Sequence, residues 1–278
     1  MQSHFLHRVD DISFSLKAPH DFSFLSPYGK AFKVFDDQDS GNICFGVENE
    51  AGEKCFIKYA GAHTLRMYIS PEEAVQNLKN ALPLYENIRH ESLIPFLGTL
   101  ETETGFGLVF AWTDGQCMGR MYPESHARFM TLGNSEKLKV FRDIQSFLAS
   151  VHRAGYTAVD FYDGSILYDF AHKQTLVCAI DYFLKQPCTN TMGRMWGSST
   201  FMSPEEWEMG AVIDETTNVY TLGAFAFALF GGYCRDREHW QLSDAAFDVA
   251  RRAVSPQRAE RPQSVAAFAD DWEKAVRS

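Results

Sequence analysis

The sequence predicts an α+β fold in which a small antiparallel sheet with one main helix precedes a larger, mainly helical part. Two patterns carry this prediction. Residues 29–59 contain three strand-like runs separated by tight turns, whereas apolar residues at helical spacing dominate the chain after Trp112. With 278 residues, the chain is long enough for two such parts that share a cleft and bury a substantial core.

The first part is built from short strands and a single helix. The runs "GKAFKVF", "ICFGVEN" and "CFIKYA" predict three antiparallel strands joined by the turns "DDQDSGN" and "EAGEK". A helix is expected to begin in "SPEEAVQNLKNAL", where Ser70 can cap, Glu73 can complete a capping box and Pro83 is expected to kink or end the helix. The runs "ESLIPFLGTLE" and "GFGLVFAW" then predict a further hairpin.

The second part reads mostly as helix. Helical spacing occurs in "SEKLKVFRDIQSFLASVHRAG", "TTNVYTLGAFAFALFGG" and "DAAFDVARRAV", and two short strands are expected around "SILYD" and "TLVCAID". No repeat, low-complexity tract or Pro/Ser-rich linker separates the two parts. We therefore expect one bilobal unit with its site in the cleft between the lobes.

Composition and charge exclude several classes of protein. Hydrophobic residues make up 45% and charged residues 22% of the chain, which is typical of a globular domain. The net charge of −10, with no cluster of Lys or Arg, makes nucleic acid and anionic membranes poor partners. Six scattered cysteines without a C-x-x-C pair favour a reducing cytoplasm, and "MQSHFLHRVDDISF" lacks the pattern of an export signal.

Four short motifs follow one another along the chain. "FIK" ends an apolar strand at Lys58, "VDFYDGSIL" places Asp160 five residues before Ser165, "IDYF" places Asp181 after a strand-like run, and "SPEE" spans residues 203–206. In this order and at this spacing they resemble V-A-I-K, H-R-D-L-x-x-x-N, D-F-G and A-P-E of the protein-kinase superfamily. The resemblance extends from about Lys33 to Trp272, and is to bacterial-type serine/threonine kinases with divergent catalytic motifs.

The resemblance implies a bilobal protein-kinase-like fold as one domain over residues 1–278, with an N-lobe at about 1–111, a hinge at about 111–115 and a C-lobe at about 116–278. It implies ATP and Mg²⁺ as cofactors, Lys58 as the residue that holds the phosphates, Asp160 as the catalytic base, and Asp181 and Ser165 as metal ligands. The residues implied for nucleotide binding are Lys58, Gly41, Ile43, Phe56, Phe110, Ala111, Thr113 and Leu167.

The resemblance also implies two structural supports. Glu205 is expected to pair with Arg261 of "AERP" and so brace the lower lobe. "NVYTLG" resembles the D-V-Y-S-L-G segment of the family, so Asn218 replaces the Asp that anchors the backbone of the catalytic loop. An amide oxygen can still accept such bonds, though without the assistance of a charge.

Several positions depart from the family pattern. The expected glycine-rich turn is "DDQDSG", so Asp36, Asp37 and Asp39 either face the triphosphate and repel it or form a solvated turn that points away. Phe56 replaces a small Ala beside adenine, so either the purine shifts and stacks on the ring or the ring closes the pocket.

Further departures concern the catalytic groups. Ser165 replaces the metal-binding Asn, and we rank it ahead of Asp163, which also fits a turn. Ala81 stands where the family places the Glu that pairs with the lysine. Ala158 and Val159 replace the H-R pair, which makes Ser198, Ser199 and Thr200 poor activation switches, and Tyr162 replaces the usual lysine of Ser/Thr kinases.

Three functions remain open on this basis. We expect an active ATP- and Mg²⁺-dependent phosphotransferase, directed at a protein, because Lys58, Asp160 and Asp181 are all retained. The alternative is a pseudokinase that acts as a binding or regulatory module, which the departures favour. A third possibility is a small-molecule kinase, since "DFYDGS" is similar to the D-x-x-x-G-N loop of aminoglycoside and choline kinases. Partners beyond ATP and an unknown protein or small-molecule substrate are not indicated.

Overall fold

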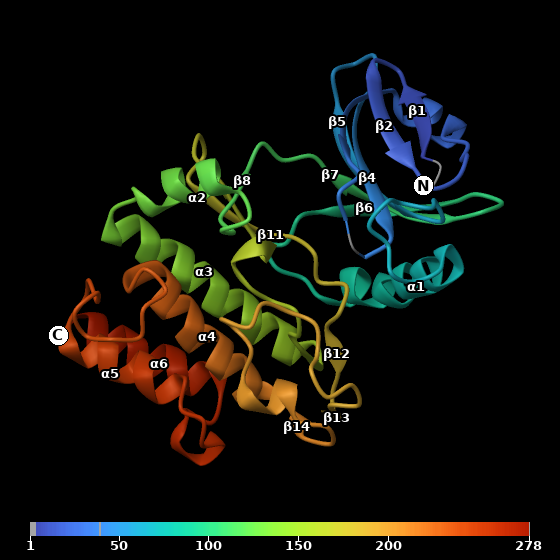
Figure 1. The fold of residues 1–278 in the computed structure, drawn as a ribbon. Helices are drawn as coiled ribbons and strands as arrows, with labels where there is room; N and C mark the ends of the chain where they lie inside the picture. The colour runs from blue at the N-terminus through green and yellow to red at the C-terminus, as the bar shows by residue number, and fades with distance from the viewer. Residues whose placement is uncertain (1–3, 39, 278) are drawn as a thin grey trace. The chain divides into compact units, whose positions relative to one another are not determined.

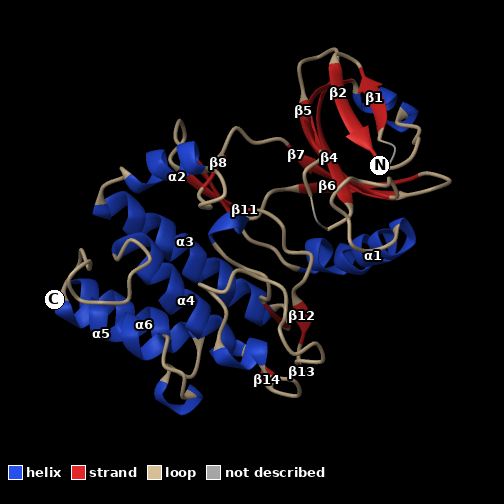
Figure 2. Cartoon of the chain, in the orientation of Figure 1, coloured by secondary structure: helices blue, strands red, loops and turns tan. Residues whose placement is uncertain are grey.

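A computed structural model describes residues 4–38 and 40–277 (Figures 1 and 2). The chain divides into two compact units, one formed by residues 1–86 and 94–114 and the other by residues 87–93 and 115–278. We name them unit 1 and unit 2 and describe each by itself. The elements confirm the α+β class, with small antiparallel sheets in both units.

Unit 1 is organised around a five-stranded antiparallel sheet of order β3-β4-β5-β7-β6. Its strands are β3 (Lys30–Phe35), β4 (Asn42–Glu48), β5 (Lys54–Ala60), β6 (Phe96–Glu101) and β7 (Phe106–Ala111). All five strands fall in the runs that the sequence predicts. The helix α1 (Pro71–Asn87) lies beside this sheet, where the Tyr85 ring packs edge-on against Phe110 at 4.8 Å.

The other face of the sheet is covered by an N-terminal segment that the sequence analysis missed. It contains β1 (Phe5–Val9), β2 (Ile12–Leu16) and the 3-10 helix η1 (Ser23–Tyr28). Buried side chains of this segment pack with the sheet in one apolar cluster, which includes Phe14, Leu16, Phe22, Leu25, Ile43, Phe45, Val47, Ile57 and Tyr59. The sequence feature that could have revealed this hairpin is the pair Asp10–Asp11 between two short apolar runs. Asp tolerates the positive φ that a tight turn needs, and Asp10 has a φ of 51° here.

The expectation for the start of α1 is confirmed. Of the two outcomes expected at Pro83, a kink or an end of the helix, the end is excluded. The Glu73 N–H donates to the Ser70 hydroxyl at 3.1 Å, as an N-cap does. The helix continues past Pro83 to Asn87. Ala81, Leu84 and Tyr85 are buried on either side of the exposed proline, so packing compensates for the missing backbone bond.

Unit 2 is built on four long helices. α3 (Asn134–Arg153), α4 (Glu215–Phe230), α5 (Asp244–Ala253) and α6 (Val265–Arg277) contact one another, and α2 (Pro123–Met130) precedes them. Almost every residue of α4 is buried, so it is the central helix of the unit. Aromatic rings from α3, α4 and α6 form its core, for example Phe141 against Trp272 at 4.7 Å.

Short strands and 3-10 turns complete unit 2. β8 (Gln116–Cys117), β10 (Ile166–Asp169) and β11 (Gln174–Val177) form a three-stranded sheet, whereas β12 (Leu184–Lys185) pairs with β9 (Tyr156–Thr157) and β13 (Cys188–Thr189) pairs with β14 (Val212–Ile213). The 3-10 turns are η2 (Asp163–Ser165), η3 (Pro204–Trp207) and η4 (Arg258–Glu260). Among the described residues, no helix is both long enough and apolar enough to cross a bilayer.

Candidate functional site

Strand β5 places two of the candidate residues on one face of the sheet in unit 1. Lys58 is paired with Leu108 and Phe56 with Phe110 on the neighbouring strand. Alternate residues of a strand point to the same face, and directly paired residues share that face. Phe56, Lys58 and Phe110 are therefore brought together.

Ile43 lies on the opposite face. It pairs with Tyr59, and both side chains are fully buried in the cluster under the N-terminal segment. The register instead places Cys44 opposite Lys58. The structure therefore does not bring Ile43 to the face that carries Phe56 and Lys58, because β4 presents Cys44 at that point.

The face that carries Lys58 is rich in aromatic rings. The ring of Phe56 is half-buried and lies 5.7 Å from Phe35 and 6.4 Å from Phe110. A Cβ added at Gly46 would come within 2.7 Å of both Phe32 and Trp112, so these two rings lie over the glycine. Aromatic side chains thus cover the part of the sheet next to Lys58.

The acidic turn between β3 and β4 is fastened inside unit 1. Asp37 forms an ion pair with Arg66, while Asp39 lies outside the described residues. Gly41 is buried with a φ of +80°, and a Cβ there would lie 3.0 Å from the Cβ of Ala74 on α1. Glycine is required at this position because it combines a left-handed backbone with close packing.

The buried face of α1 carries no carboxylate. Ala81, the position at which the family has its glutamate, is fully buried. The other buried residues of this helix are Ala74, Leu78, Leu84 and Tyr85. A carboxylate partner for Lys58 does not come from this face of the helix.

The predicted hinge begins at the end of β7. The Ala111 N–H donates to the Pro95 carbonyl at 2.9 Å, so this donor is already used within unit 1. The indole N–H of Trp112 donates to Asp114 at 2.9 Å, which fixes the ring at the end of the unit. Thr113, between them, is half-buried.

In unit 2, the β10–β11 hairpin collects candidate residues at one end. Ile166, the first residue of β10, is paired with Val177, the last residue of β11. Ser165 directly precedes β10, and its carbonyl accepts the Cys178 N–H at 2.9 Å. Asp181 follows four residues after β11, so both predicted metal ligands leave the same end of this hairpin. Leu167 lies on the central strand, paired with Leu176 and Cys117.

Asp160 lies in a loop whose backbone is held from α4. The Asn218 side chain accepts the Ala158 N–H at 3.0 Å and donates to the Ala158 carbonyl at 2.7 Å, which confirms the anchoring predicted for Asn218. Asp160 has a positive φ of 56°, and the adjacent Phe161 is buried against Phe147 and Phe225. The chain is thus held two residues before Asp160 and directly after it, which keeps Asp160 in this sparsely populated backbone conformation.

Asp163 has a supporting contact within unit 2. Its carboxylate is buried, accepts the Tyr233 hydroxyl at 2.7 Å and lies 4.0 Å from the Arg120 guanidinium. Burial, together with this bond, raises the pKa of Tyr233. These contacts tie the turn before β10 to the segment after α4. They give the buried Asp163 carboxylate a structural role that requires no metal ion.

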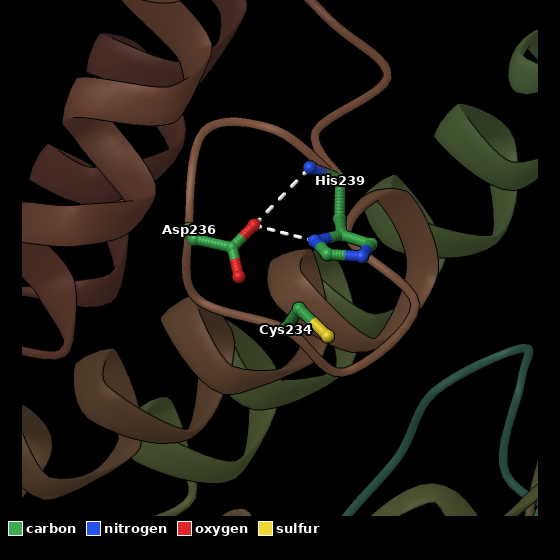
Figure 3. A group of neighbouring side chains, drawn as sticks. All are labelled: Cys234, Asp236 and His239. Carbon is green, nitrogen blue, oxygen red and sulfur yellow. Dashed lines mark hydrogen bonds and ion pairs between the residues drawn. The ribbon is translucent and has the colours of Figure 1, made fainter.

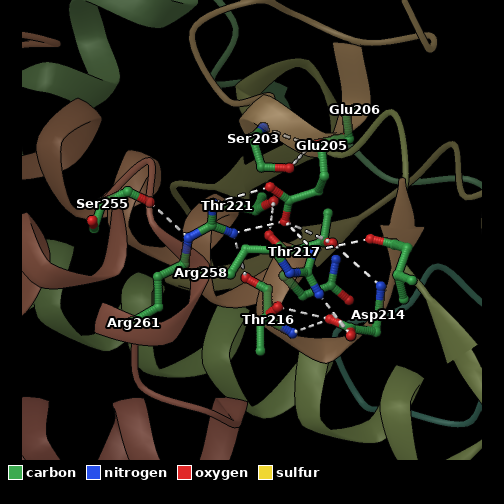
Figure 4. A network of polar contacts seen from close by, with 12 residues as sticks. Ser203, Glu205, Glu206, Asp214, Thr216, Thr217, Thr221, Ser255, Arg258 and Arg261 are labelled. Atoms are coloured by element: carbon green, nitrogen blue, oxygen red, sulfur yellow. Dashed lines mark hydrogen bonds and ion pairs between the residues drawn. The ribbon is translucent and has the colours of Figure 1, made fainter. Parts of the chain in front are cut away.

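The predicted pair of Glu205 and Arg261 is confirmed (Figure 4). Two parallel bonds of 2.7 and 3.0 Å join the guanidinium to both carboxylate oxygens, and both side chains are buried. Arg258 and Thr217 bind the same carboxylate at 2.8 and 3.0 Å. Burial acts to raise the pKa of Glu205, but the bonds to Arg261 outweigh it and the pKa is lowered.

Glu206 is a further buried carboxyl, which the sequence analysis missed. It accepts the Ser203 N–H at 2.6 Å and the Ser203 hydroxyl at 2.9 Å, completing a capping box on η3. It lines a small cavity together with Asp160, Gly197 and Thr221. Burial raises its pKa to about 7, and the charge of Asp160 acts in the same direction. In the sequence, the second Glu of "SPEE" was the sole signal.

No family model matches the chain. It is 23% identical over 225 residues to a probable serine/threonine-protein kinase, gdt2, from Dictyostelium discoideum. It is 25% identical over 214 residues to the maternal embryonic leucine zipper kinase of Danio rerio, and 25% identical over 257 residues to the hormonally up-regulated neu tumor-associated kinase of Homo sapiens.

This chain is similar to serine/threonine protein kinases. The alignments cover 75%, 73% and 82% of it, which includes residues of both units. The same alignments span 13%, 29% and 34% of the relatives, so most of each relative lies outside the similarity. That the chain is of the bacterial type stays a prediction.

Proposed function

We propose that the chain is an ATP- and Mg²⁺-dependent phosphotransferase of the protein-kinase superfamily that transfers the γ-phosphate to a hydroxyl group. The observation that carries this proposal is the clamp of Asn218 on the backbone of Ala158, two residues before Asp160. A clamp on this loop is useful to an enzyme because phosphoryl transfer depends on positioning. The similarity to serine/threonine protein kinases supports the same reaction class.

Each charged candidate then has a role. Asp160 orients the acceptor hydroxyl and takes up its proton, and Lys58 steadies the phosphates. Asp181 and Ser165 fit Mg²⁺ by their chemistry, since a carboxylate and a hydroxyl are hard oxygen donors and both leave the same end of the β10–β11 hairpin. When bound, Mg²⁺ neutralises charge on the phosphates.

The nucleotide base is proposed to bind on the aromatic face of unit 1. The Phe56 side chain is partly exposed beside Lys58, so the purine stacks on it instead of occupying the space that a small residue leaves. Phe110 packs against Phe56. The proposed adenine contacts are completed by the backbone of Ala111 and Thr113 and by the side chain of Leu167. Gly41 shapes the turn on the phosphate side, whereas Ile43 supports the sheet from its other face.

A protein hydroxyl is the proposed acceptor. The segment 197–206 resembles the peptide-docking activation segment of protein kinases, and its Glu205 is braced by Arg261. One relative, gdt2, is named as a probable serine/threonine-protein kinase, which supports Ser or Thr as the acceptor residue. A small-molecule acceptor remains the third candidate, and the braced segment argues against it.

The second candidate is a pseudokinase that binds partners without turnover. The buried face of α1 has Ala81 in place of a glutamate, and Phe56 lies among other rings beside Lys58. Both observations favour a pseudokinase in which this face of unit 1 no longer binds ATP. The retained Lys58, Asp160 and Asp181 favour the enzyme, because a cleft without turnover gives no physical reason to keep all three.

The finer organisation is part of the same proposal. We take residues 1–278 as one kinase-like domain, with an N-lobe at about 1–111, a hinge at about 111–115 and a C-lobe at about 116–278; the boundary between the compact units falls after Asp114. No disulfide joins the six cysteines, all of which are described, and this favours a reducing cytoplasm.

Thermal unfolding tests the proposal. The midpoint is measured with and without ATP, in Mg²⁺ and in EDTA, for the wild type and for Asp181→Ala. Ligand that binds the folded state raises the midpoint, by about 5 °C at a hundredfold excess over Kd. We expect a Mg²⁺-dependent rise that Asp181→Ala abolishes.

Asp169→Asn is the matched control, because Asp169 lies at the other end of the same hairpin, where it caps a turn through Ala171 and His172. This variant should keep the ATP-dependent rise. No rise at millimolar ATP in the wild type would overturn the enzyme and direct the search to binding partners.

A further inference from the structure

The geometry points to a site for one Zn²⁺ ion in the loop that follows α4. Cys234, Asp236 and His239 each offer a ligand atom, and these three atoms all lie within 4.8 Å of one another (Figure 3). None of the three belongs to the residues proposed for phosphoryl transfer. The site is therefore an addition to the proposed function and does not depend on it.

The donor set selects the metal. A thiolate and an imidazole are ligands of Zn²⁺, whereas Mg²⁺ and Ca²⁺ prefer oxygen. Zn²⁺ with three protein ligands completes its tetrahedron with water. Cys234, Asp236 and His239 match this number and these types of ligand, so Zn²⁺ can bind here independently of the Mg²⁺ ligands on the β10–β11 hairpin.

The loop is held at both ends, which preorganises the ligands. The Cys234 N–H donates to the Gly231 carbonyl at 2.9 Å, and the preceding Tyr233 N–H donates to Phe227 on α4 at 3.0 Å. Trp240, directly after His239, is buried against Phe227 and Trp272. The described contacts thus fix the chain on either side of the three ligands, so binding need order few further residues.

The ligands already contact one another at the surface. His239 Nδ1 lies 2.6 Å from Asp236 Oδ1, and the His239 N–H donates to the same oxygen at 3.2 Å (Figure 3). The side chains of His239 and Asp236 are 54% and 57% exposed, so an ion can enter without opening the core. A tetrahedral Zn²⁺ site spaces its ligand atoms at about 3–4 Å, which side-chain rotation alone can reach from the observed spacing. The thiol proton of Cys234 leaves to solvent when the Zn–S bond forms.

The neighbouring cations are held by other groups. Arg235 donates to the Tyr220 hydroxyl at 2.9 Å and to the Thr200 carbonyl at 3.0 Å, and Arg237 forms an ion pair with Asp244. These contacts hold both guanidinium groups at partners outside the ligand set. Repulsion of a divalent cation by the loop is reduced accordingly.

The bound ion would stabilise supports of the segments around Asp160 and Thr200. Tyr233 of this loop donates to Asp163, and Arg235 donates to Thr200. The proposed ligand Cys234 lies between Tyr233 and Arg235 in sequence. We therefore expect Zn²⁺ to slow amide hydrogen exchange in residues 231–240 first.

Metal titration of the whole, metal-stripped chain tests the site. Co²⁺ serves as the spectroscopic probe and Zn²⁺ as the competitor, with EDTA-treated wild type as the start. We expect one equivalent of Co²⁺ to give a thiolate-to-cobalt charge-transfer band and tetrahedral d–d bands, and one equivalent of Zn²⁺ to remove both. Cys234→Ser should abolish the charge-transfer band. His239→Gln and Asp236→Asn should each weaken Zn²⁺ binding by about 100-fold or more, because loss of a ligand costs more than loss of a group that only orients a ligand.

The chain supplies a matched control. His172 and Asp169 have the same spacing in sequence and a ring-to-carboxylate distance of 2.8 Å, but within the described part of the chain no cysteine joins them in a cluster. His172→Gln should therefore leave Zn²⁺ affinity unchanged. A charge-transfer band that survives Cys234→Ser, or a Zn²⁺ affinity that falls equally in His172→Gln, would overturn the site. Circular dichroism of each apo variant verifies that the fold is intact.

Discussion

The two units of this chain differ in how far they keep the features expected of a kinase. In unit 2, Asn218 clamps Ala158, and Arg261 binds both oxygens of Glu205. In unit 1, the proposed nucleotide face carries Phe56 where the family has a small residue, and α1 has Ala81 where the family has a glutamate.

The difference shows that the supports of a catalytic loop and the surface for a nucleotide are separate physical requirements. The supports in unit 2 are buried polar groups, and removing one partner leaves the other unsatisfied at a high cost. The proposed nucleotide face in unit 1 is lined by aromatic rings, and apolar groups accept hydrophobic substitutions when the total volume is kept. The following substitutions test each side of this comparison.

Asp160→Asn should have the largest effect if unit 2 still supports chemistry. Asn keeps the size of the side chain but cannot take up a proton, so turnover should fall by about 10²–10⁴-fold. Nucleotide affinity, measured by the thermal shift with Mg²⁺ and ATP, should stay the same. Equal turnover in both proteins would remove Asp160 from the reaction.

Arg261→Ala should show that the brace of unit 2 is essential for stability. It leaves the buried Glu205 carboxylate without its bidentate partner, which costs about 3–5 kcal/mol. The midpoint of thermal unfolding should fall by about 5–9 °C. Arg258→Ala is the control, since Arg258 binds the same carboxylate but its side chain is 32% exposed, and it should cost much less. Comparable losses in the two variants would contradict the buried brace.

Glu206→Gln should change how stability depends on pH. Burial raises the pKa of Glu206 from 4.5 to about 7, so between these values the folded chain binds more protons than the unfolded chain. The stabilisation is complete below pH 4.5 and is lost as pH rises through 7, by about 3 kcal/mol in total. Gln keeps an oxygen for the Ser203 donors and does not titrate, so the variant should lose this decline.

Chemical denaturation from pH 4.5 to 8 measures this effect. The control is Glu208→Gln, two residues further on, where the side chain is exposed. It should keep the decline of the wild type. An unchanged pH profile in Glu206→Gln would show that the carboxyl is ionised in the folded chain at pH 5.

Phe56→Ala addresses unit 1 and should have the smallest effect. If the purine stacks on the ring, its loss weakens ATP binding by about tenfold, within the 1–3 kcal/mol of a base on an aromatic side chain. Isothermal titration with Mg²⁺ and ATP measures the affinity, and Phe56→Tyr should bind as the wild type does. Tighter binding by Phe56→Ala would show instead that the ring obstructs the nucleotide, and the comparison between the units would then favour the pseudokinase.

Much of the secondary structure followed from local pattern. The strands β3 to β7 and the helices α3, α4 and α5 were visible as periods of two and of 3.6 residues. Pro83 misled the prediction because the end of α1 is decided by the packing of Leu84 and Tyr85, which the local sequence does not encode. The N-terminal hairpin was missed because its strands are short and flank an Asp–Asp turn.

The site residues divide in the same way. The spacing of the motifs was sufficient to predict two contacts, that of Asn218 with Ala158 and that of Glu205 with Arg261. Both follow from residue types at fixed positions in the family that the sequence resembles. Spacing did not reveal that Ile43 faces the N-terminal cluster, because a shift of one residue in register moves a side chain to the other face of a sheet.

The sequence by itself determined which chemical groups the chain has and in what order: Lys58, Asp160, Ser165 and Asp181, and the acidic turn whose only glycine is Gly41. The tertiary structure decided which of them share a surface and in what environment. Glu205 and Glu206 show the reason most simply. They are identical neighbours in sequence, yet one binds Arg261 and has a lowered pKa, while the other is buried beside Ser203 and has a raised one. Proton affinity depends on solvation and on nearby charge, and both are set by residues distant in sequence.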